Sequence, residues 1–540
     1  METGDVVKPP SSRVKRIALP AGPVLAFAFT FALRAGGLEL DDSMLAGVTL
    51  WCAIWWVTEP VPVPATSLIP LAFLPILGLL DHKSTANAYG DSLILLLMGG
   101  FMLSRAMEST GTHRKVALGV VKGVARLGGR GGRSVVLGFM VATAVLSMWI
   151  SNTATTLMML PVALAVIAGA SDRKMAIPLL LGIAYAANIG GIGTPIGTPP
   201  NIIFMGAFDQ LGVRDGSYGF LEWMKAGVPV VVIFVPIAWW WLTRGLGGDE
   251  TFDLPEGEPW TQGQRRVIVM FSIAAGLWIF QKYPALPVEW FEGIGWAKGG
   301  GWTGLLGLAT DGALDARMSG SATVAALVVV LLFAFPDGDG GRLLDWDHAK
   351  TIPWGVLLLF GGGIALAQAF KSTGLSEVIA GNLGGMKDIP IPVMVLIVCL
   401  LTTFLTEITS NTALTALLMP ILGATALALE VDPVILMAPA AMSASCAFML
   451  PVATAPNAAV YGTEKVPIDR MVREGFVLNL IGVAIISTLA MFLVSKASEG
   501  VDADLLPDAP AESAAEVRRS VESSEVSESS HAGRRNKVTS

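Results

Sequence analysis

Long apolar runs are the feature that most constrains how this chain can fold. Runs of about 18 or more apolar residues, the length that crosses a bilayer of about 30 Å as a helix, recur along most of the 540 residues. Only 15% of the residues are charged, whereas soluble domains have about 25%. These observations exclude a soluble protein and predict an all-α polytopic membrane protein.

The apolar runs predict about eleven transmembrane helices and two hairpins that do not cross the membrane. The expected spans are 18–35, 44–58, 64–80, 91–108, 177–208, 227–243, 267–283, 320–336, 353–370, 431–461 and 474–495. Two further apolar regions, 133–170 and 391–430, are too long for one helix. Each has a Ser-Asn-Thr triplet near its middle, so we expect two half-helices that meet at a polar tip. Such a re-entrant hairpin is tolerated at membrane depth only where it is buried or lines a cavity.

Positive charges predict the orientation. With the N-terminus inside, five basic segments share the cytoplasmic side: Lys8 to Arg16, Arg114 to Arg133, Arg173 with Lys174, Arg265 with Arg266, and Lys465 to Arg473. The acidic loop at 39–43 and the C-terminus then lie outside, as do Lys371 and Lys387, two cations against the trend. We expect a multi-pass protein of the inner (plasma) membrane, in contact with the lipid bilayer and with no nucleic-acid partner.

The predicted organisation has six parts. An N-terminal cytoplasmic segment (1–17) precedes scaffold helices with the start of a first repeat (18–130), and the first hairpin and a broken helix follow (131–243). The second half begins with a cytoplasmic loop and the scaffold helices of a second repeat (244–390). It continues with the second hairpin, a broken helix and the last helix (391–497) and ends in an acidic tail (498–540). The tail has almost no large apolar residues, so it should be disordered. Residues 284–319 are rich in Gly and Trp and are expected to form an irregular external loop.

An internal repeat relates the two halves. "GGFMLSRAMESTG" (99–111) pairs with "GGIALAQAFKSTG" (362–374), the triplets follow, and "GIGTPIGTPPN" (191–201) then pairs with "FMLPVATAPN" (448–457). An odd number of crossings separates equivalent points, so the repeats should have opposite orientations. Inverted repeats with interrupted helices are a transporter design whose binding site lies at the repeat interface near the midplane.

The interruptions carry the expected chemistry. Consecutive prolines in the segment Gly197 to Asn201 should break one helix, and Ala453 to Asn457 should break its counterpart. Free N–H groups at a helix end attract anions, and free carbonyls with hydroxyl and amide oxygens suit a hard cation such as sodium. The tips and breaks contain no Lys, Arg or His. A bound anion would therefore be neutralised by helix N-termini and by at least two co-bound cations.

Some polar residues have a structural interpretation as an alternative to a functional one. Single Ser and Thr residues in membrane helices often bond back to a carbonyl one turn earlier. Glu407 is an acid within an apolar region and hence a functional candidate, although a structural role as a cap is the favoured interpretation. Arg105 and Glu108 have no counterparts of the same type in the second repeat, where Gln368 and Lys371 stand. We interpret that pair as interfacial or structural.

The paired triplets and the segment "SCAFMLPVATAPNAAVYG" (445–462) resemble the divalent anion/sodium symporter family, from about residue 40 to residue 495. Members carry di- and tricarboxylates or sulfate. The resemblance implies a homodimer in which each protomer has a scaffold domain and a mobile transport domain that moves like an elevator. The family commonly has "ATPPN" where this chain has "ATAPN", and Ala455 at this position could alter substrate choice.

The resemblance also implies specific ligands. A first sodium site would comprise Ser147, Ser151, Asn152 and the carbonyl near Gly197, and a second would comprise Thr406, Thr409, Asn411 and the carbonyl near Ala453. The substrate carboxylates would meet Asn152, Thr153, Asn411 and Thr412, with Thr198, Pro199, Thr454 and Ala455 close by. Triplets that end in threonine resemble those of C4-dicarboxylate carriers more than those of citrate carriers.

These arguments predict a sodium-coupled symporter for a C4-dicarboxylate such as succinate, malate or fumarate. The alternatives are a sulfate or citrate symporter, a sodium-independent dicarboxylate exchanger and an anion channel. An intramembrane enzyme is not expected, because the sequence has neither paired membrane aspartates nor an HExxH zinc motif.

Overall fold

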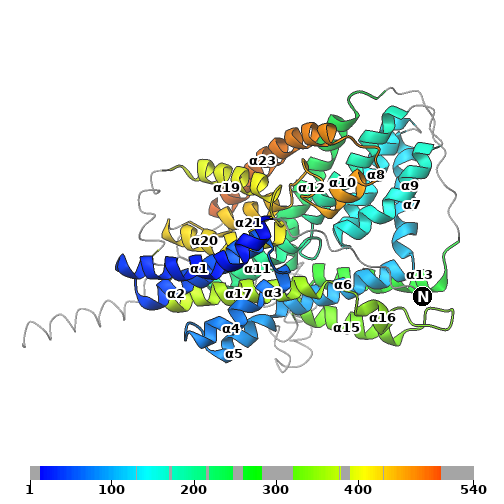
Figure 1. Cartoon of the computed structure of the whole chain (residues 1–540). Helices are drawn as coiled ribbons and strands as arrows, with labels where there is room; N and C mark the ends of the chain where they lie inside the picture. Colours follow the sequence, from blue (N-terminus) through cyan, green and yellow to red (C-terminus); the bar gives the residue numbers. More distant parts are fainter. Residues whose placement is uncertain are drawn as a thin grey trace, which may run out of the picture. The chain divides into compact units, whose positions relative to one another are not determined.

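A computed structural model describes residues 13–128, 131–168, 173–213, 218–246, 259–281, 320–375, 378, 389–429 and 431–499 (Figure 1). The predictions for Lys8, for the loop at 284–319 and for the tail beyond residue 499 lie outside these residues. Within them the regular elements are helices, and one isolated bridge joins Pro336 to Arg342. The predicted all-α class is confirmed.

The chain divides into two units, Met1–Ala490 and Met491–Ser540. The described elements belong to the first unit, except for the end of the last helix. In the second unit the described residues, up to 499, continue helix α23 (Ile468–Glu499).

Helices α1 (Arg13–Ala35) and α2 (Leu40–Thr58) pack along each other. Gly22 lets the Trp55 ring lie against α1, where its indole N–H donates to the Ala18 carbonyl at 3.1 Å. Exposed apolar side chains of α1, among them Phe27 and Phe31, fit contact with lipid.

The expected span at 64–80 is instead two short helices, α3 (Val63–Thr66) and α4 (Leu68–Ile76). Pro70 explains the division, because it has no N–H to donate to the carbonyl of Thr66 one turn earlier. Helix α5 (His82–Tyr89) follows, and α6 (Ser92–Ser109) runs on as a long apolar helix.

Both predicted hairpins are broken at their triplets. The first consists of α8 (Gly132–Ser147) and α9 (Asn152–Ala168), and the second of α19 (Ile391–Thr406) and α20 (Asn411–Ala428). Helices α8 and α19 have 16 residues each, about 24 Å at 1.5 Å per residue. That length is less than a full hydrocarbon layer of about 30 Å. Helix α20, however, has 18 residues and is long and apolar enough to cross a membrane, so the expectation that neither hairpin crosses stays a prediction.

Both predicted helix breaks are present. Helix α10 (Ala176–Gly191) is separated from α11 (Pro199–Leu211), and α21 (Val434–Ala444) from α22 (Ala455–Tyr461). The prolines do not end the first segments; they begin the second ones, in the first turn after Thr198 or Thr454. Proline is well placed there because the N–H groups of a first turn have no partner within the helix.

In each repeat, the short helix that follows the break packs against the hairpin of the other repeat. Helix α11 of the first repeat contacts α20 and α21 of the second, and α22 of the second repeat contacts α9 and α10 of the first. Each hairpin is thus completed by a short helix from the other half of the chain.

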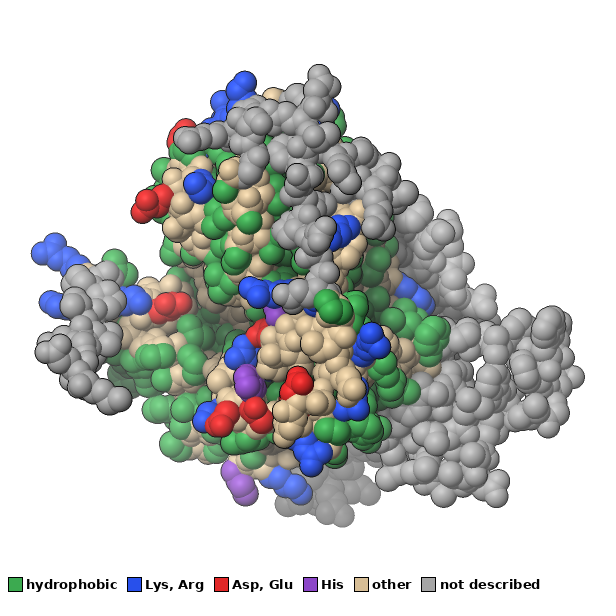
Figure 2. Space-filling model, turned by 90° about the vertical axis from the view of Figure 1, so that its right-hand side faces the viewer, with side chains coloured by type: hydrophobic (Ala, Val, Ile, Leu, Met, Phe, Trp, Pro, Cys, Tyr) green, Lys and Arg blue, Asp and Glu red, His purple; other side chains and the backbone are tan. Residues whose placement is uncertain are grey.

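The remaining helices are α7 (Thr112–Gly128), the short 3₁₀ turn η1 (Arg173–Met175), α12 (Phe220–Thr243), α13 (Gln262–Ile279), α15 (Ser321–Ala334), α16 (Trp346–Ala349) and α17 (Trp354–Thr373). Six described segments are long and apolar enough to cross a membrane: α1, His82–Ser109, α12, α17, α20 and α23 up to Met491. Figure 2 shows one face of the molecule, where basic, acidic and histidine side chains gather between apolar ones.

We expect Gly190→Ala to destabilise the protein. A Cβ at Gly190 would lie 2.6 Å from Ala144 Cα on α8, and relief of such crowding costs about 1–3 kcal/mol. Gly276→Ala on α13 is the matched control, since a Cβ there meets nothing within 4 Å. The thermal unfolding midpoint in detergent should fall for the first variant alone. Equal midpoints would contradict the close packing of α8 on α10.

Candidate functional site

Both hairpin tips and both helix breaks line one cavity of about 910 Å³. Twelve of the predicted site residues line it directly: Ser151, Asn152, Thr153, Gly197, Thr198, Pro199, Thr409, Asn411, Thr412, Ala453, Thr454 and Ala455. The other two, Ser147 and Thr406, are fully buried and bond to the asparagines that line it. Residues from opposite halves of the chain therefore surround a single space.

In the first hairpin, three oxygens converge beside the tip. Ser147 Oγ lies 2.6 Å from Asn152 Oδ1 and 2.8 Å from the carbonyl oxygen of Ala187 on α10. A hydroxyl has one proton to donate, so it satisfies only one of these two acceptors at a time. The group therefore has a surplus of oxygen lone pairs, which is the environment that a hard cation prefers.

The second hairpin repeats this geometry. Thr406 Oγ1 lies 2.5 Å from Asn411 Oδ1 and 2.9 Å from the carbonyl oxygen of Ala444 on α21. The two alanine carbonyls were not anticipated from the sequence, since a backbone oxygen leaves no side-chain signal.

Backbone oxygens also crowd around Gly197. A Cβ there would lie against the carbonyl oxygen of Gly191 and 2.9 Å from that of Met148, and a Cβ at Gly191 would lie 2.7 Å from Asn152 Oδ1. Only glycine lets these carbonyls approach each other and the tip so closely.

Other predicted ligands have local bonds. The Thr409 hydroxyl donates to the Leu405 carbonyl at 2.7 Å, back along α19. Ser410, which begins the second triplet and was not a predicted ligand, caps α20 by accepting from the N–H of Ala413 at 3.4 Å. Thr454 caps α22 by accepting from the N–H of Asn457 at 3.3 Å.

At the tips and breaks, helices α9, α11 and α20, each of more than eight residues, begin at the cavity. A helix N-terminus has unpaired N–H groups and a partial positive charge, which favour an anion. The cavity thus has anion-attracting helix ends beside the two oxygen clusters.

Matched asparagines brace the breaks. Asn201 Nδ2 donates to the carbonyls of Gly191 (2.8 Å) and Thr194 (2.7 Å). In the second half, Asn457 Nδ2 donates to the carbonyls of Ala447 (3.0 Å) and Leu450 (3.1 Å). The carbonyls of Thr194 and Leu450 also accept turn bonds from the N–H groups of Gly197 and Ala453, each at 3.2 Å. The asparagines thus add a second bond at each turn and hold the interrupted backbone in place.

Glu407 stabilises the second break by bonding to its N–H groups, whereas Asn457 bonds to its carbonyls. It is buried, and its carboxylate accepts from the N–H groups of Phe448 (2.8 Å), Met449 (2.9 Å) and Leu450 (3.0 Å) and from Asn479 Nδ2 (2.7 Å). All four contacts are donors, so the side chain has a structural role, which was the favoured interpretation, but it caps the second break and not a hairpin helix.

Asn188 connects the two halves and was missed from the sequence. Its Nδ2 lies 3.3 Å from the Ala447 carbonyl and 3.1 Å from Thr454 Oγ1, and it follows Ala187 of the first oxygen cluster. An asparagine within the apolar run of α10 was the available signal, because amides are rare at such positions unless they have a partner.

A further part of the cavity wall comes from α1, α2, α6 and the start of α17. It includes two ion pairs, Arg105 with Glu108 and Lys15 with Glu59. The pair on α6 was expected to be interfacial or structural, but both of its side chains line the cavity.

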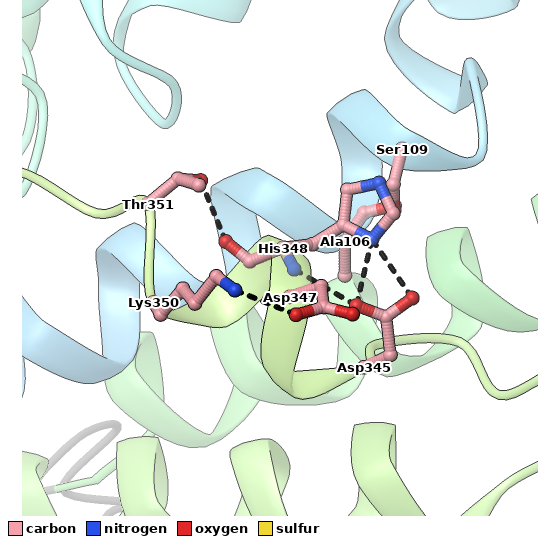
Figure 3. Close-up of polar contacts among 7 residues, drawn as sticks. All are labelled: Ala106, Ser109, Asp345, Asp347, His348, Lys350 and Thr351. Atoms are coloured by element: carbon pink, nitrogen blue, oxygen red, sulfur yellow. Dashed lines mark hydrogen bonds and ion pairs between the residues drawn. The ribbon is translucent and has the colours of Figure 1, made fainter.

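Thr351 borders the cavity beside the α16 turn, to whose His348 carbonyl its hydroxyl donates at 2.7 Å (Figure 3). The N–H of His348 beside Asp345 lowers the pKa of that carboxyl, and the Asp347 carboxylate raises the pKa of the Lys350 ammonium. The charges of this turn are therefore bonded to one another.

A sequence model described as the citrate transporter family (CitMHS) matches residues 53–438. Two similar proteins are both named sodium-dependent dicarboxylate transporter SdcS. The one from Staphylococcus saprophyticus is 36% identical over 503 residues, covering 88% of this chain and 91% of the relative. The one from Staphylococcus aureus (strain bovine RF122 / ET3-1) is 36% identical over 520 residues, covering 92% and 94%.

Two solved structures share the fold. The Alcanivorax borkumensis YdaH transporter has 15% sequence identity and a TM-score of 0.51, covering 83% of this chain and 98% of that one. Neisseria gonorrhoeae MtrF, described with a class of antimetabolite efflux pumps, has 13% identity and a TM-score of 0.52, covering 78% and 84%. At these identities the comparison concerns architecture alone.

We expect Glu407→Ala to destabilise the second break. The change leaves three buried N–H groups without an acceptor, each at a cost of about 1–3 kcal/mol. The thermal unfolding midpoint in detergent should fall markedly, and less so for Glu407→Gln, which keeps one oxygen. The control is Glu222→Gln, because within the described segments Glu222 accepts from a single N–H, that of Gly219 at 2.6 Å. A Glu407→Ala midpoint no lower than that of the control would refute the bracing role.

Proposed function

Since the chain belongs to the citrate transporter (CitMHS) family of divalent anion/sodium symporters, we propose that it imports a C4-dicarboxylate together with sodium. Succinate, malate and fumarate are the expected solutes. Membership confirms the resemblance on which the sequence argument relied, and it makes the protein a membrane transporter rather than an enzyme.

One observation carries the proposal: two matched oxygen clusters flank a cavity at which helix N-termini converge. Ser147 with Asn152 and Thr406 with Asn411 supply neutral oxygens that suit sodium. No group of three His, Cys, Asp or Glu side chains that could hold a transition metal occurs among the described residues. Neutral ligands leave a bound sodium its full positive charge, which then favours a dianion beside it.

This arrangement supports coupling. The asparagine that supplies an oxygen to each cluster also begins the helix, α9 or α20, whose N-terminus faces the cavity. A sodium ion held there would fix the tip and add its charge, so that the dianion binds well only when sodium is bound. Two clusters support at least two sodium ions for each solute.

An elevator movement is part of the proposal. The cavity lies between the tips and breaks on one side and α1, α2, α6 and α17 on the other. The first group would move as one body across the second, in a homodimer with cytoplasmic N-termini. The exchange of α11 and α22 between the repeats supports such rigid movement, because neither hairpin can shift without the other.

Citrate is the second candidate substrate. The family description names citrate, and a cavity of about 910 Å³ has room for a tricarboxylate. The similar proteins named for dicarboxylates and the threonines that end both triplets favour the smaller solute.

The decisive test is uptake of radiolabelled succinate into proteoliposomes under an inward sodium gradient, with potassium as the comparison and citrate and sulfate as competitors. Sodium-dependent accumulation above equilibrium is expected. Asn152→Ala and Asn411→Ala should abolish it while the protein keeps its unfolding midpoint. Flux that does not depend on sodium would indicate an exchanger or a channel. Normal uptake by either variant would contradict the proposal that both asparagines belong to one shared binding site.

We expect Ser147→Ala and Thr406→Val each to raise the sodium concentration for half-maximal uptake about tenfold. Each variant removes one oxygen ligand, worth about 1–2 kcal/mol, and a factor of ten corresponds to about 1.4 kcal/mol. Ser272→Ala on α13 is the control, because this hydroxyl bonds back to Ile268 at 2.8 Å and is exposed. An unchanged sodium dependence in both site variants would show that the clusters do not bind the coupling ions.

A further inference from the structure

Helix α6 presents one face to the cavity. Phe101, Ser104, Arg105 and Glu108 line it, at the spacing of residues that share one side of a helix. Among the cavity-lining residues the charged ones are Lys15, Glu59, Arg105 and Glu108. Two cations and two acids leave this wall without net formal charge.

Arg105 is close to the first helix break along α6. A Cβ at Gly100 would lie 3.2 Å from Ile196 Cγ2, and Ile196 precedes Gly197 of the break. Arg105 is five residues further along, a rise of about 7.5 Å. It lines the same cavity as Asn152 of the first tip and Gly197 of the break, so an anion held there lies in the space that the arginine side chain borders.

The Arg105 guanidinium has N–H donors that its ion pair with Glu108 does not use. It pairs with Glu108 through one terminal nitrogen, whereas its Nε is buried and has no hydrogen-bond partner in the part of the chain that the structure describes. Five N–H donors in a planar fork suit a carboxylate in a bidentate arrangement. The side chain is about one-third exposed, which leaves it accessible from the cavity.

The pair is not a cross-link between elements. Arg105 and Glu108 belong to one helix at a spacing of three residues, whereas Arg244 and Glu474 connect α12 to α23. Intrahelical pairs add little to stability. The charges of the neighbouring α16 turn are bonded within it (Figure 3), so Glu108 is the acid that holds Arg105.

We propose that Arg105 is a substrate-binding residue that exchanges its Glu108 partner for a carboxylate of the transported dianion. Glu108 keeps the guanidinium within the wall until an anion arrives and competes with that anion for it. The inference rests on the proposed function and extends it, because the solute's second carboxylate would meet a fixed positive charge outside the hairpin tips and helix breaks.

The test compares succinate affinity in Arg105→Gln, Glu108→Gln and the double variant, measured as the uptake KM in proteoliposomes and as the Kd by calorimetry in detergent with sodium. Arg105→Gln should weaken affinity about tenfold, the effect of losing one charged hydrogen bond. Glu108→Gln should strengthen it about threefold, since the competing acid is gone. The double variant should resemble Arg105→Gln, and the preference for succinate over butyrate should shrink in both.

Lys371→Gln is the matched control, because Lys371 occupies the position of Glu108 in the second repeat and does not line the cavity. Its KM and Kd should equal those of the unmodified protein. An unchanged Kd in Arg105→Gln, or an equal loss of affinity in Arg105→Gln and Glu108→Gln, would overturn the proposal. Sodium-independent uptake by the unmodified protein would instead refute the proposed function, and calorimetry would still report on Arg105.

Discussion

The structure depends on how the polar backbone of two interrupted helices is satisfied at membrane depth. Hydrocarbon offers no hydrogen-bond partner, so those groups of the breaks that do not face the cavity need a partner from the protein. Asn201 and Asn457 donate hydrogen bonds to carbonyls of the two breaks, and the Glu407 carboxylate accepts hydrogen bonds from N–H groups of the second break. Trp223 on α12 adds a bond from its indole to the Ile192 carbonyl at 2.7 Å. Because these braces fix the breaks, the tips of both hairpins can converge on one cavity with their oxygens in matched positions.

The symmetry between the repeats is close but incomplete. Ser147 and Thr406 make equivalent contacts, and each has one proton for two acceptors. The residue after each differs, however, since Met148 stands where the second repeat has Glu407. The first break is compact and glycine-lined, while the second is longer and is held by a buried carboxylate. A solute between them therefore meets two unlike halves, which suits a solute whose two ends are bound differently.

The sequence predicted those features that produce a local signal. The triplets interrupt apolar runs with polar residues, and the helices end there as predicted. The prolines after Thr198 and Thr454 likewise predicted the positions of both breaks. Helix is present within the expected span at 64–80, from Val63 to Ile76, but it is shorter than expected and is interrupted at Ser67. The exchange of α11 and α22 could not be foreseen, since nothing in either segment specifies which hairpin it will contact. The carbonyls of Ala187 and Ala444 have no side-chain signal, and Arg105 looked interfacial because its place on the cavity face depends on how α6 packs.

The exchange of short helices also has a consequence for biosynthesis. The first hairpin needs α22, which lies about 300 residues further along the chain than Asn152. At about 5–20 residues per second, a ribosome takes about 15–60 s to make that intervening length. Throughout this interval the first tip and its polar groups must wait in the membrane without their partner. Assembly of the cavity is therefore a late event in synthesis, and the nascent first half is the stage at which a chaperone or insertase would have most to protect.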